Sequence, residues 1–448
     1  MKNFLDKLNI KTIILHPFLI SLFPILELYE HNKDQLKLFY LVRPLIISFL
    51  ASIIIYWAIK KVIKNKNKSA IITSFFIILF FAFNHYAEMI PDITAVAKTI
   101  VPGAYLLLFL WIFIFITLSV LIIPTKNDLN LATKFLNATA VILIIMPLIN
   151  ISLYEQKTRQ IFQGIEAKND WPNIQGGYRP DIYYIIFDAY GRADVLKEIY
   201  GYDNSGFIKY LDKKNFYVAD QSRSNYPQTF FSISSSLNFE YLDDLARAMS
   251  EESNDRRPLR EMIKNNKVYD ILKSHGYQFV VLPSIWSGVY KNLKGDIFLD
   301  DHQKELNDFE KMLIPSLKLR GWTAQRGEKI LNNLKIIPEL TKYDFPTFTY
   351  VHFMAPHPPF IFDRSGNPLD PAQNDRSGFD GDHYFAKNPD KDDYKKKYID
   401  EIIFINGQIQ TMIDEILNKS KEPPIIILQS DHGPGSMTYW EDPKKTNM

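Results

Sequence analysis

The hydrophobic residues of the chain are unevenly distributed, and the pattern changes near residue 155. Before that point, long apolar blocks alternate with short polar links. A membrane-spanning helix needs about 20 mostly apolar residues, and five segments qualify: about 12–29, 39–59, 70–90, 102–123 and 134–154. Later residues have the mixed pattern of a globular domain. We therefore predict a membrane domain with five helices (1–155), a linker (156–180) and a globular domain (181–448).

Lysines in the short loops predict how this membrane domain is oriented, because cytoplasmic loops carry an excess of Lys and Arg. The lysines on the predicted cytoplasmic side before the first span and between the second and third are Lys2, Lys7, Lys11, Lys60, Lys61, Lys64, Lys66 and Lys68. The loop between the third and fourth spans holds Glu88 and Asp92 with only Lys98. Lys33 and Lys37 are exceptions on the outer side. We expect a multi-pass protein of the plasma membrane, with a cytoplasmic N-terminus and an extracytoplasmic globular domain.

Four short apolar runs in the globular domain are rich in β-branched and aromatic residues, which is typical of buried parallel strands. They are residues 182–187, 279–282, 347–351 and 425–428. Helical patterns lie between them, including Tyr398 to Leu417. This alternation predicts an α/β fold, a parallel sheet with helices on both faces. The polar stretch 363–397 has the composition of a surface insertion.

Composition excludes several classes of function. The chain of 448 residues contains no cysteine, so a disulfide framework, a zinc ribbon, a cysteine nucleophile and a formylglycine made from cysteine are all excluded. Its 52 Lys and Arg residues nearly balance 50 Asp and Glu residues. This balance provides no electric field that would attract nucleic acid.

Acidic residues and histidines follow three of the predicted strands. Asp188 follows the first, His352 and then His357 follow the third, and Asp431 and His432 follow the last. Ligands of an open α/β sheet gather at the carboxyl ends of its strands, and carboxylate and imidazole groups suit Zn²⁺ or Mn²⁺. Each residue also has a structural explanation, since an Asp after a strand often caps a helix and Pro-His-Pro can form a rigid turn.

A nucleophile is offered by the segment Asn-Tyr-Pro-Gln-Thr, which ends at Thr229 and leads into a helix start rich in small residues. A hydroxyl group at a helix N-terminus lies beside free backbone N–H groups and the positive end of the helix dipole, which favours a phosphate oxygen. Coordination to a metal would lower its pKa. The alternative is that Thr229 only caps the helix.

Four motifs in order resemble the sulfatase-like branch of the alkaline phosphatase superfamily. They are Phe-Asp-Ala-Tyr-Gly-Arg at 187–192, Asn-Tyr-Pro-Gln-Thr at 225–229, His-Phe-Met-Ala-Pro-His-Pro-Pro at 352–359 and Ser-Asp-His-Gly at 430–433. That branch includes lipoteichoic acid synthases and lipid A phosphoethanolamine transferases. The resemblance covers about residues 180–435 and implies an alkaline phosphatase-like sheet.

The resemblance also implies roles for individual residues. A divalent metal, Zn²⁺ or Mn²⁺, would be held by Asp188, Thr229, Asp431 and His432, with Thr229 as the nucleophile. His357 matches a histidine that contacts the transferred phosphate or acts as general acid. His352 is a second candidate for binding the substrate. Relatives usually continue well beyond the Asp-His-Gly motif, so we expect either a short C-terminal subdomain or an incomplete copy.

The nucleophile motif bears on the reaction. True sulfatases have the motif Cys/Ser-x-Pro-x-Arg at the nucleophile, but Thr229 is followed by Phe-Phe-Ser-Ile. We therefore expect a phosphotransferase that uses a membrane phospholipid as donor, a phospho-threonine intermediate, and a cell-envelope glycan or glycolipid as acceptor. The alternatives are a sulfatase or phosphodiesterase of the same fold, and a non-catalytic binding or scaffolding protein. A transporter is disfavoured by the lack of an internal repeat and by the large globular domain.

The topology can be tested with a reporter enzyme fused after Gly177. Five crossings after a cytoplasmic N-terminus place this point outside the cytoplasm. We therefore expect activity from a reporter that works only outside the cytoplasm. Activity of a reporter that works only in the cytoplasm would contradict the predicted orientation.

Overall fold

The computed structural model describes residues 13–89, 103–162, 177–249, 253–284, 293–299, Asn307, 309–310, 322–369, 380–386, 389–440, Asp442 and 444–445. The chain forms two compact units. The first consists of Met1–Gln160 with Leu306–Lys318, and the second consists of Ile161–Glu305 with Leu319–Met448. The chain therefore passes between the two units more than once.

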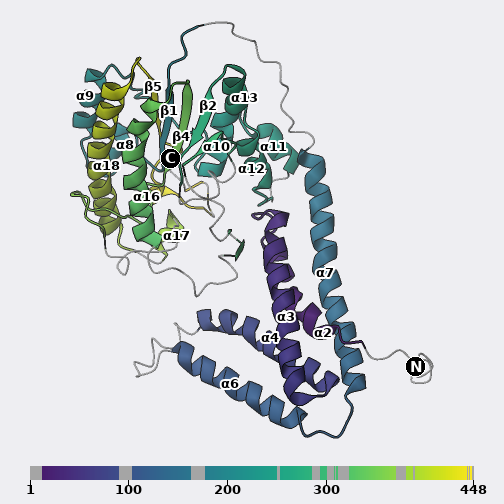
Figure 1. Cartoon of the computed structure of the whole chain (residues 1–448). Coiled ribbons are helices and arrows are strands. Elements are labelled where there is room, and N and C mark those ends of the chain that lie inside the picture. Colours follow the sequence, from purple (N-terminus) through teal and green to yellow (C-terminus); the bar gives the residue numbers. More distant parts are fainter. Residues whose placement is uncertain are drawn as a thin grey trace. The chain divides into compact units, whose positions relative to one another are not determined.

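Helices in the first unit occupy the regions predicted to span a membrane (Figure 1). They are α2 (His16–His31), α3 (Val42–Ile63), α4 (Lys66–Met89), α6 (Gly103–Ile122) and α7 (Asn130–Phe162). Within the described residues, three stretches are long and apolar enough to cross a membrane: Leu38–Ile63, Lys66–Phe83 and Asn130–Arg159. The described apolar part of α6 is shorter, and α2 has only 16 residues. Three candidate spans are thus supported, and the prediction of five is not confirmed.

A short segment from late in the sequence packs within this first unit. Phe309 is completely buried, and its ring meets that of Tyr29 edge to face with centroids 5.9 Å apart. The carboxylate of the neighbouring Glu310 forms a two-pronged ion pair with the guanidinium group of Arg43, at the start of α3. Paired hydrogen bonds of this kind fix orientation as well as position, so the segment has a defined place in the unit.

The second unit is built on a parallel sheet with the strand order β3-β2-β4-β1-β5. All the strand pairs in it are parallel. The strands are β1 (Ile182–Phe187), β2 (Gln278–Val281), β3 (Ile297–Phe298), β4 (Thr347–Phe353) and β5 (Ile425–Gln429). The predicted α/β class and the four predicted strands are confirmed to within two residues at each end. The two-residue strand β3 was not predicted.

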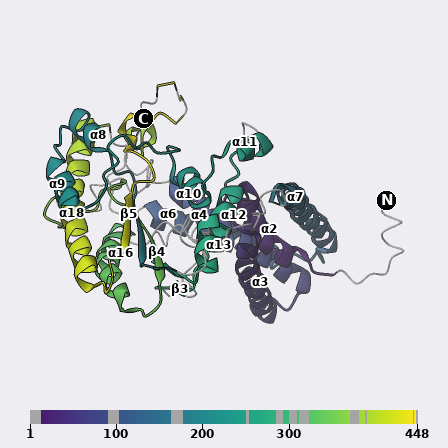
Figure 2. The same ribbon diagram turned by 90° about the horizontal axis from the view of Figure 1, so that it is seen from above.

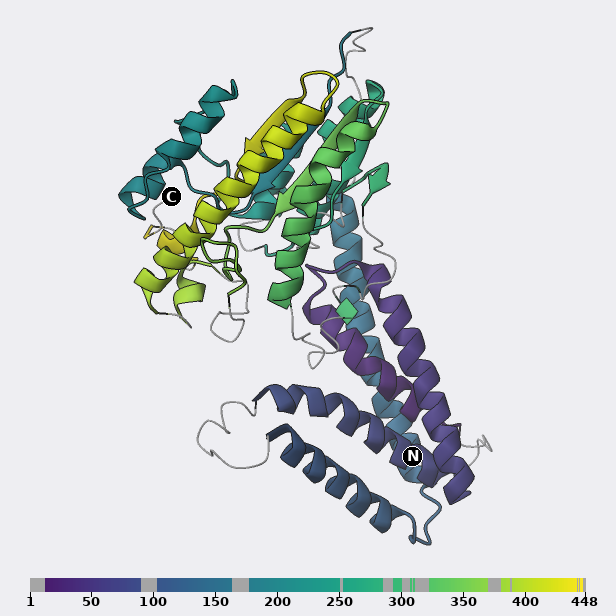
Figure 3. The same ribbon diagram turned by 60° about the vertical axis from the view of Figure 1, so that its left-hand side comes forward.

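Successive side chains along the central strands pack against helices on opposite faces of the sheet. On one face, Tyr183, Ile185 and Phe187 pack with residues of α16 and α18. On the other face, Tyr184 and Ile186 pack with residues of α10, α12 and α13. Burial of both faces explains why these strands are continuous apolar runs rather than alternating patterns. Figure 2 shows the helical layers on the two faces of the sheet. Figure 3 shows α16 and α18 side by side in one of these layers.

The helices of the second unit have defined bounds. They are α8 (Ala193–Glu198), α9 (Ser205–Lys213), α10 (Thr229–Asn238), α11 (Asp243–Met249), α12 (Arg257–Lys264), α13 (Lys267–Ser274), α16 (Trp322–Ile336), α17 (Asp382–Phe385) and α18 (Lys391–Lys419). The helix predicted from Tyr398 to Leu417 is part of α18. Within the polar stretch 363–397, Tyr384 and Tyr394 are buried against Phe360. This stretch therefore contributes to the core and is not only a surface insertion.

Replacement of one central isoleucine should measure how far the sheet stabilises the second unit. Ile185 is completely buried in β1, so Ile185→Ala should lower the free energy of unfolding by about 2–5 kcal/mol. The matched control Ile427→Ala lies in the outer strand β5 and is 41% exposed, so its effect should be much smaller. Thermal unfolding of both full-length variants in detergent, followed by tryptophan fluorescence, measures the difference. Equal effects would contradict the assigned burial.

Candidate active site

The sheet brings the predicted acidic residues together at the carboxyl ends of adjacent strands. Asp188 is the first residue after β1, and its backbone N–H donates to the carbonyl of Phe353 at 2.9 Å. Asp431 lies two residues beyond the end of β5. Because β1 lies between β4 and β5, the loops that follow these three strands meet at one edge. This is the edge where ligands of open α/β sheets bind.

Thr229 is the first residue of α10, and Gln228 before it occupies the cap position in an extended conformation. Thr229 therefore does not cap the helix, which was the structural alternative for this residue. Its side chain is 5% exposed, and its Oγ1 lies 3.4 Å from Nε2 of His432. The helix dipole places partial positive charge at this end. The hydroxyl group thus faces the acidic cluster rather than its own helix.

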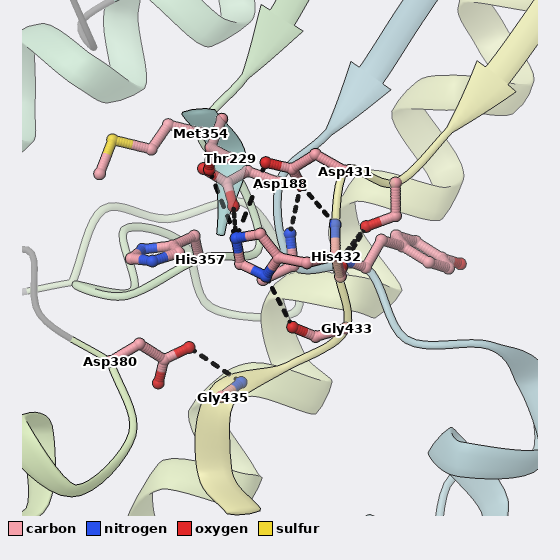
Figure 4. Close-up of polar contacts among 12 residues, drawn as sticks. Asp188, Thr229, Met354, His357, Asp380, Asp431, His432, Gly433 and Gly435 are labelled. Carbon is pink, nitrogen blue, oxygen red and sulfur yellow. Dashed lines mark hydrogen bonds and ion pairs between the residues drawn. The ribbon is translucent and has the colours of Figure 1, made fainter. Parts of the chain in front are cut away.

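Asp188, Asp431 and His432 form a buried cluster in which one ligand atom from each lies within 4.8 Å of the others. Nε2 of His432 is 3.3 Å from Oδ1 of Asp188 and 3.7 Å from Oδ2 of Asp431. Figure 4 shows these side chains converging with Thr229. Three of the four predicted metal ligands are therefore adjacent, and the hydroxyl group of the fourth contacts one of them.

Hydrogen bonds fix the orientation of His432. Its Nδ1 lies 2.8 Å from the carbonyl oxygen of Gly433, and since a carbonyl only accepts, Nδ1 is the donor. The other nitrogen, Nε2, is then directed at the carboxylates. A ligating histidine usually donates its second nitrogen in this way. Ser430 supports the same loop, because its hydroxyl group donates to the carbonyl of His432 at 2.5 Å and accepts from the N–H of Tyr190 at 2.9 Å.

The residues present fit a divalent metal. Oδ1 of Asp188 is buried and makes no hydrogen bond among the described residues, although Nε2 of His432 lies 3.3 Å away and buried polar atoms are normally satisfied. The cluster offers carboxylate oxygens and an imidazole nitrogen, a set that suits Zn²⁺ or Mn²⁺. A cation would satisfy the Asp188 oxygen and offset the charge of two neighbouring carboxylates.

The pKa values report the same excess of negative charge. Burial raises the pKa of Asp188 and the charge of Asp431 adds to the shift. Burial also disfavours the charge of Asp431, but His432 and His352 hold its pKa below the ordinary value. Burial opposes protonation of His432, yet Asp431 and Asp188 raise its pKa to about 9. These shifts share one cause, the proximity of two buried carboxylates.

The two remaining histidines occupy different positions. His352 is 2% exposed, and its Nε2 lies 3.4 Å from Oδ2 of Asp431 and 3.8 Å from Oδ2 of Asp188. It therefore contacts both carboxylates from inside the protein. His357 is more accessible, with its ring centroid 6.1 Å from that of His432. Its Nδ1 donates to the carbonyl of Pro358 at 2.6 Å, which leaves Nε2 available to a substrate.

A cavity of about 2460 Å³ opens in front of this cluster. Thr229, His357 and His432 line it, together with exposed aromatic residues such as Phe239 and Tyr241. His352 is not among the described residues that line this cavity. The cavity is far larger than a phosphate group and has room for a substrate of lipid size.

Sequence reasoning did not identify two residues that hold the site loops. The hydroxyl group of Tyr398, in α18, donates to the carbonyl of Ala189 at 2.8 Å and accepts from the N–H of Gly191 at 2.9 Å. Asp380 accepts from the N–H of Gly435 at 2.9 Å. Each of these residues is far in the sequence from the loop that it contacts, and neither belongs to a local motif.

Comparison with known proteins places the chain in a family. The family model described as Sulfatase matches residues 180–448, which is more than half of the chain. The chain belongs to the sulfatase family, and it is accordingly an enzyme of the sulfatase-like hydrolase and transferase kind. This confirms the resemblance drawn from the four motifs.

Solved structures and curated proteins were also compared. The chain is similar to the integral membrane protein lipooligosaccharide phosphoethanolamine transferase A (EptA) from Neisseria meningitidis, with 12% sequence identity and a TM-score of 0.37. The similarity covers 93% of this chain and 80% of that chain. No curated protein matches the chain.

Metal content should depend on the acidic cluster. Asp431→Ala and His432→Ala each remove one ligand atom of the buried trio, so we expect either variant to lose most of the bound Zn²⁺ or Mn²⁺. Elemental analysis of purified full-length protein measures this loss. His383→Ala is the matched control, because His383 lines the same cavity but is outside the trio. Full retention of metal in all three variants would exclude the cluster as the site.

Proposed function

We propose that this protein is a membrane-anchored, metal-dependent phosphotransferase. It moves a phospho-headgroup from a membrane phospholipid to a hydroxyl group of a cell-envelope glycan or glycolipid, through a phospho-threonine intermediate. The observation that carries the proposal is the position of Thr229, whose Oγ1 lies 3.4 Å from Nε2 of His432 beside the buried carboxylates. Threonine cannot become the formylglycine of sulfatases, so phosphoryl transfer suits this nucleophile better than sulfate ester hydrolysis.

Several side chains of the site have separate roles in the first step. A divalent cation held by Asp188, Thr229, Asp431 and His432 would lower the pKa of the threonine hydroxyl and stabilise charge on the phosphoryl oxygens. Oγ1 of Thr229, having released its proton to water, attacks the phosphorus of the donor, and the bond from phosphorus to the glycerol oxygen breaks. His357 donates a proton from Nε2 to this oxygen, and diacylglycerol leaves as a neutral alcohol.

The second step reverses these roles. His357, now lacking a proton at Nε2, accepts one from the acceptor hydroxyl, whose oxygen attacks the phosphorus. The bond to Oγ1 of Thr229 breaks and the threonine alkoxide is regenerated. His352 takes no direct part in this scheme, because its contacts with both carboxylates suit it to hold them in place. Attack by water in place of the acceptor would make the same site a phosphodiesterase.

The first unit supports a location in a membrane. Its apolar helices support a multi-pass protein of the plasma membrane, with residues 1–155 as the membrane domain, 156–180 as a linker and 181–448 as the catalytic domain. The lysine distribution supports a cytoplasmic N-terminus and an extracytoplasmic catalytic domain. A membrane phospholipid is a natural donor for an enzyme anchored in this way, and the large cavity beside Thr229 has room for one.

Removal of the nucleophile should abolish the reaction. Purified protein in detergent, with Zn²⁺ or Mn²⁺ and fluorescent phosphatidylglycerol or phosphatidylethanolamine, should release diacylglycerol. Thr229→Ala should lower the rate by roughly 10⁴-fold or more, because the hydroxyl forms the covalent intermediate. Thr229→Ser should retain activity.

Ser232→Ala is the matched control, since Ser232 lies one turn further along α10 and lines the same cavity. The rate of diacylglycerol release by this variant should remain close to that of the parent protein. Equal rates for the parent and Thr229→Ala would contradict the assigned nucleophile, and no release from any lipid by the parent would favour a binding or scaffolding role.

A further inference from the structure

One turn of α16 lies directly behind the segment that carries His357. Arg326 in this turn is 1% exposed, and its Nη2 donates to the backbone carbonyls of both Met354 and His357. One nitrogen therefore joins two points of the loop three residues apart. The rigid, planar guanidinium group is well suited to such paired contacts.

Gly327, the next residue of α16, allows this helix to approach the loop closely. A Cβ atom at this position would lie 3.1 Å from Cγ2 of Ile361 and 3.2 Å from Cζ of Phe362. Ile361 and Phe362 are both buried, so neither has free space into which to move. Arg326 and Gly327 thus fix the segment on both sides of the two prolines that follow His357.

A buried carboxyl group attracts the positive charge of Arg326. Glu401 of α18 is completely buried and accepts from the N–H of Ile361 at 3.4 Å. Burial lowers the pKa of Arg326 to about 10, but Glu401 attracts its positive charge. Burial likewise raises the pKa of Glu401 to about 8, and Arg326 opposes that rise. Burying an ion is unfavourable unless it is paired and hydrogen-bonded, and the attraction of Glu401 offsets part of that cost for Arg326.

We propose that Arg326 is a positioning residue for His357, acting with Gly327 to hold its imidazole at the distance from Thr229 that proton donation requires. This inference rests on the proposed function, in which His357 protonates the leaving alcohol. Arg326 acts only through the backbone of residues 354–357 and does not touch the substrate. A general acid must be within hydrogen-bond reach of the oxygen that it protonates, and a small displacement lowers the rate strongly.

The test compares phosphodiesters with different leaving groups. An alkoxide leaves slowly unless it is protonated, but p-nitrophenolate is stable enough to leave without a proton. Misplacement of the general acid should therefore slow cleavage of an alkyl ester and spare the p-nitrophenyl ester. Loss of folded protein, in contrast, lowers both rates equally.

Arg326→Lys keeps the positive charge but loses the planar group that joins the two carbonyls. We measure the first step alone, as release of the leaving group in a single turnover, because His357 also acts in the second step. The rate for an alkyl phosphodiester should fall about 10²-fold or more, the usual contribution of general acid catalysis, while the p-nitrophenyl ester loses less than about threefold. Gly327→Ala should give the same pattern, and it provides a second test if Arg326→Lys does not fold. His357→Ala removes the general acid itself, so it shows how large the selective loss for the alkyl ester can be.

Asn333→Ala is the matched control on the same helix. Asn333 is 3% exposed and donates to the carbonyl of Pro283 at 2.7 Å, so its loss disturbs a buried hydrogen bond of α16 without touching the His357 segment. It should affect both esters alike.

Two results would overturn the inference in distinguishable ways. If His357→Ala shows the selective loss but Arg326→Lys and Gly327→Ala slow both esters equally, the positioning role is wrong and the proposed function stands. If His357→Ala itself slows release of both leaving groups equally in a single turnover, the general-acid role in the proposed function is wrong, and the positioning role with it.

Discussion

Two carboxylates buried side by side are the constraint on which the site depends. Asp188 and Asp431 lie at the end of the sheet, and removing such ions from water costs several kcal/mol each unless opposite charge or hydrogen bonds compensate. The compensation comes from several elements: His352 within β4, His432 in the loop after β5, and the N-terminal end of α10. An arrangement that depends on added positive charge is well suited to hold a metal ion and a phosphate group.

The sequence predicted the part of the fold that local patterns encode. Buried parallel strands are continuous apolar runs because both of their faces are covered, and this is why β1 and β4 were found with nearly correct ends. Strand β5 is also an apolar run and was found in the same way, although it lies at the edge and Ile427 in it is exposed. Asp188 directly follows one such run and Asp431 comes shortly after another, so their meeting was predicted from the common edge of a parallel sheet. Thr229 was found because Asn-Tyr-Pro-Gln-Thr marks a loop that enters a helix.

Other features of the site depend on contacts between distant parts of the chain. Arg326 contacts a loop about 30 residues later, and Tyr398 contacts a loop more than 200 residues earlier. No periodicity or local motif reports such pairs, so both residues read as ordinary members of their helices. Strand β3 was missed because two residues are too few to form a pattern. The prediction of five membrane spans is not confirmed, because apolar length in the sequence does not determine where a helix begins and ends, and three candidate spans are supported among the described residues.

The segment that contains Phe309 and Glu310 has a practical consequence for anyone who wishes to study the catalytic domain alone. Hydropathy suggests a single cut in the linker after the last apolar helix. However, residues 306–318 belong to the first unit although they lie within the stretch that matches the sulfatase family. A fragment beginning near residue 181 would expose the fully buried ring of Phe309 and leave Glu310 without Arg43. A water-soluble fragment would need this segment redesigned as well as the helices removed.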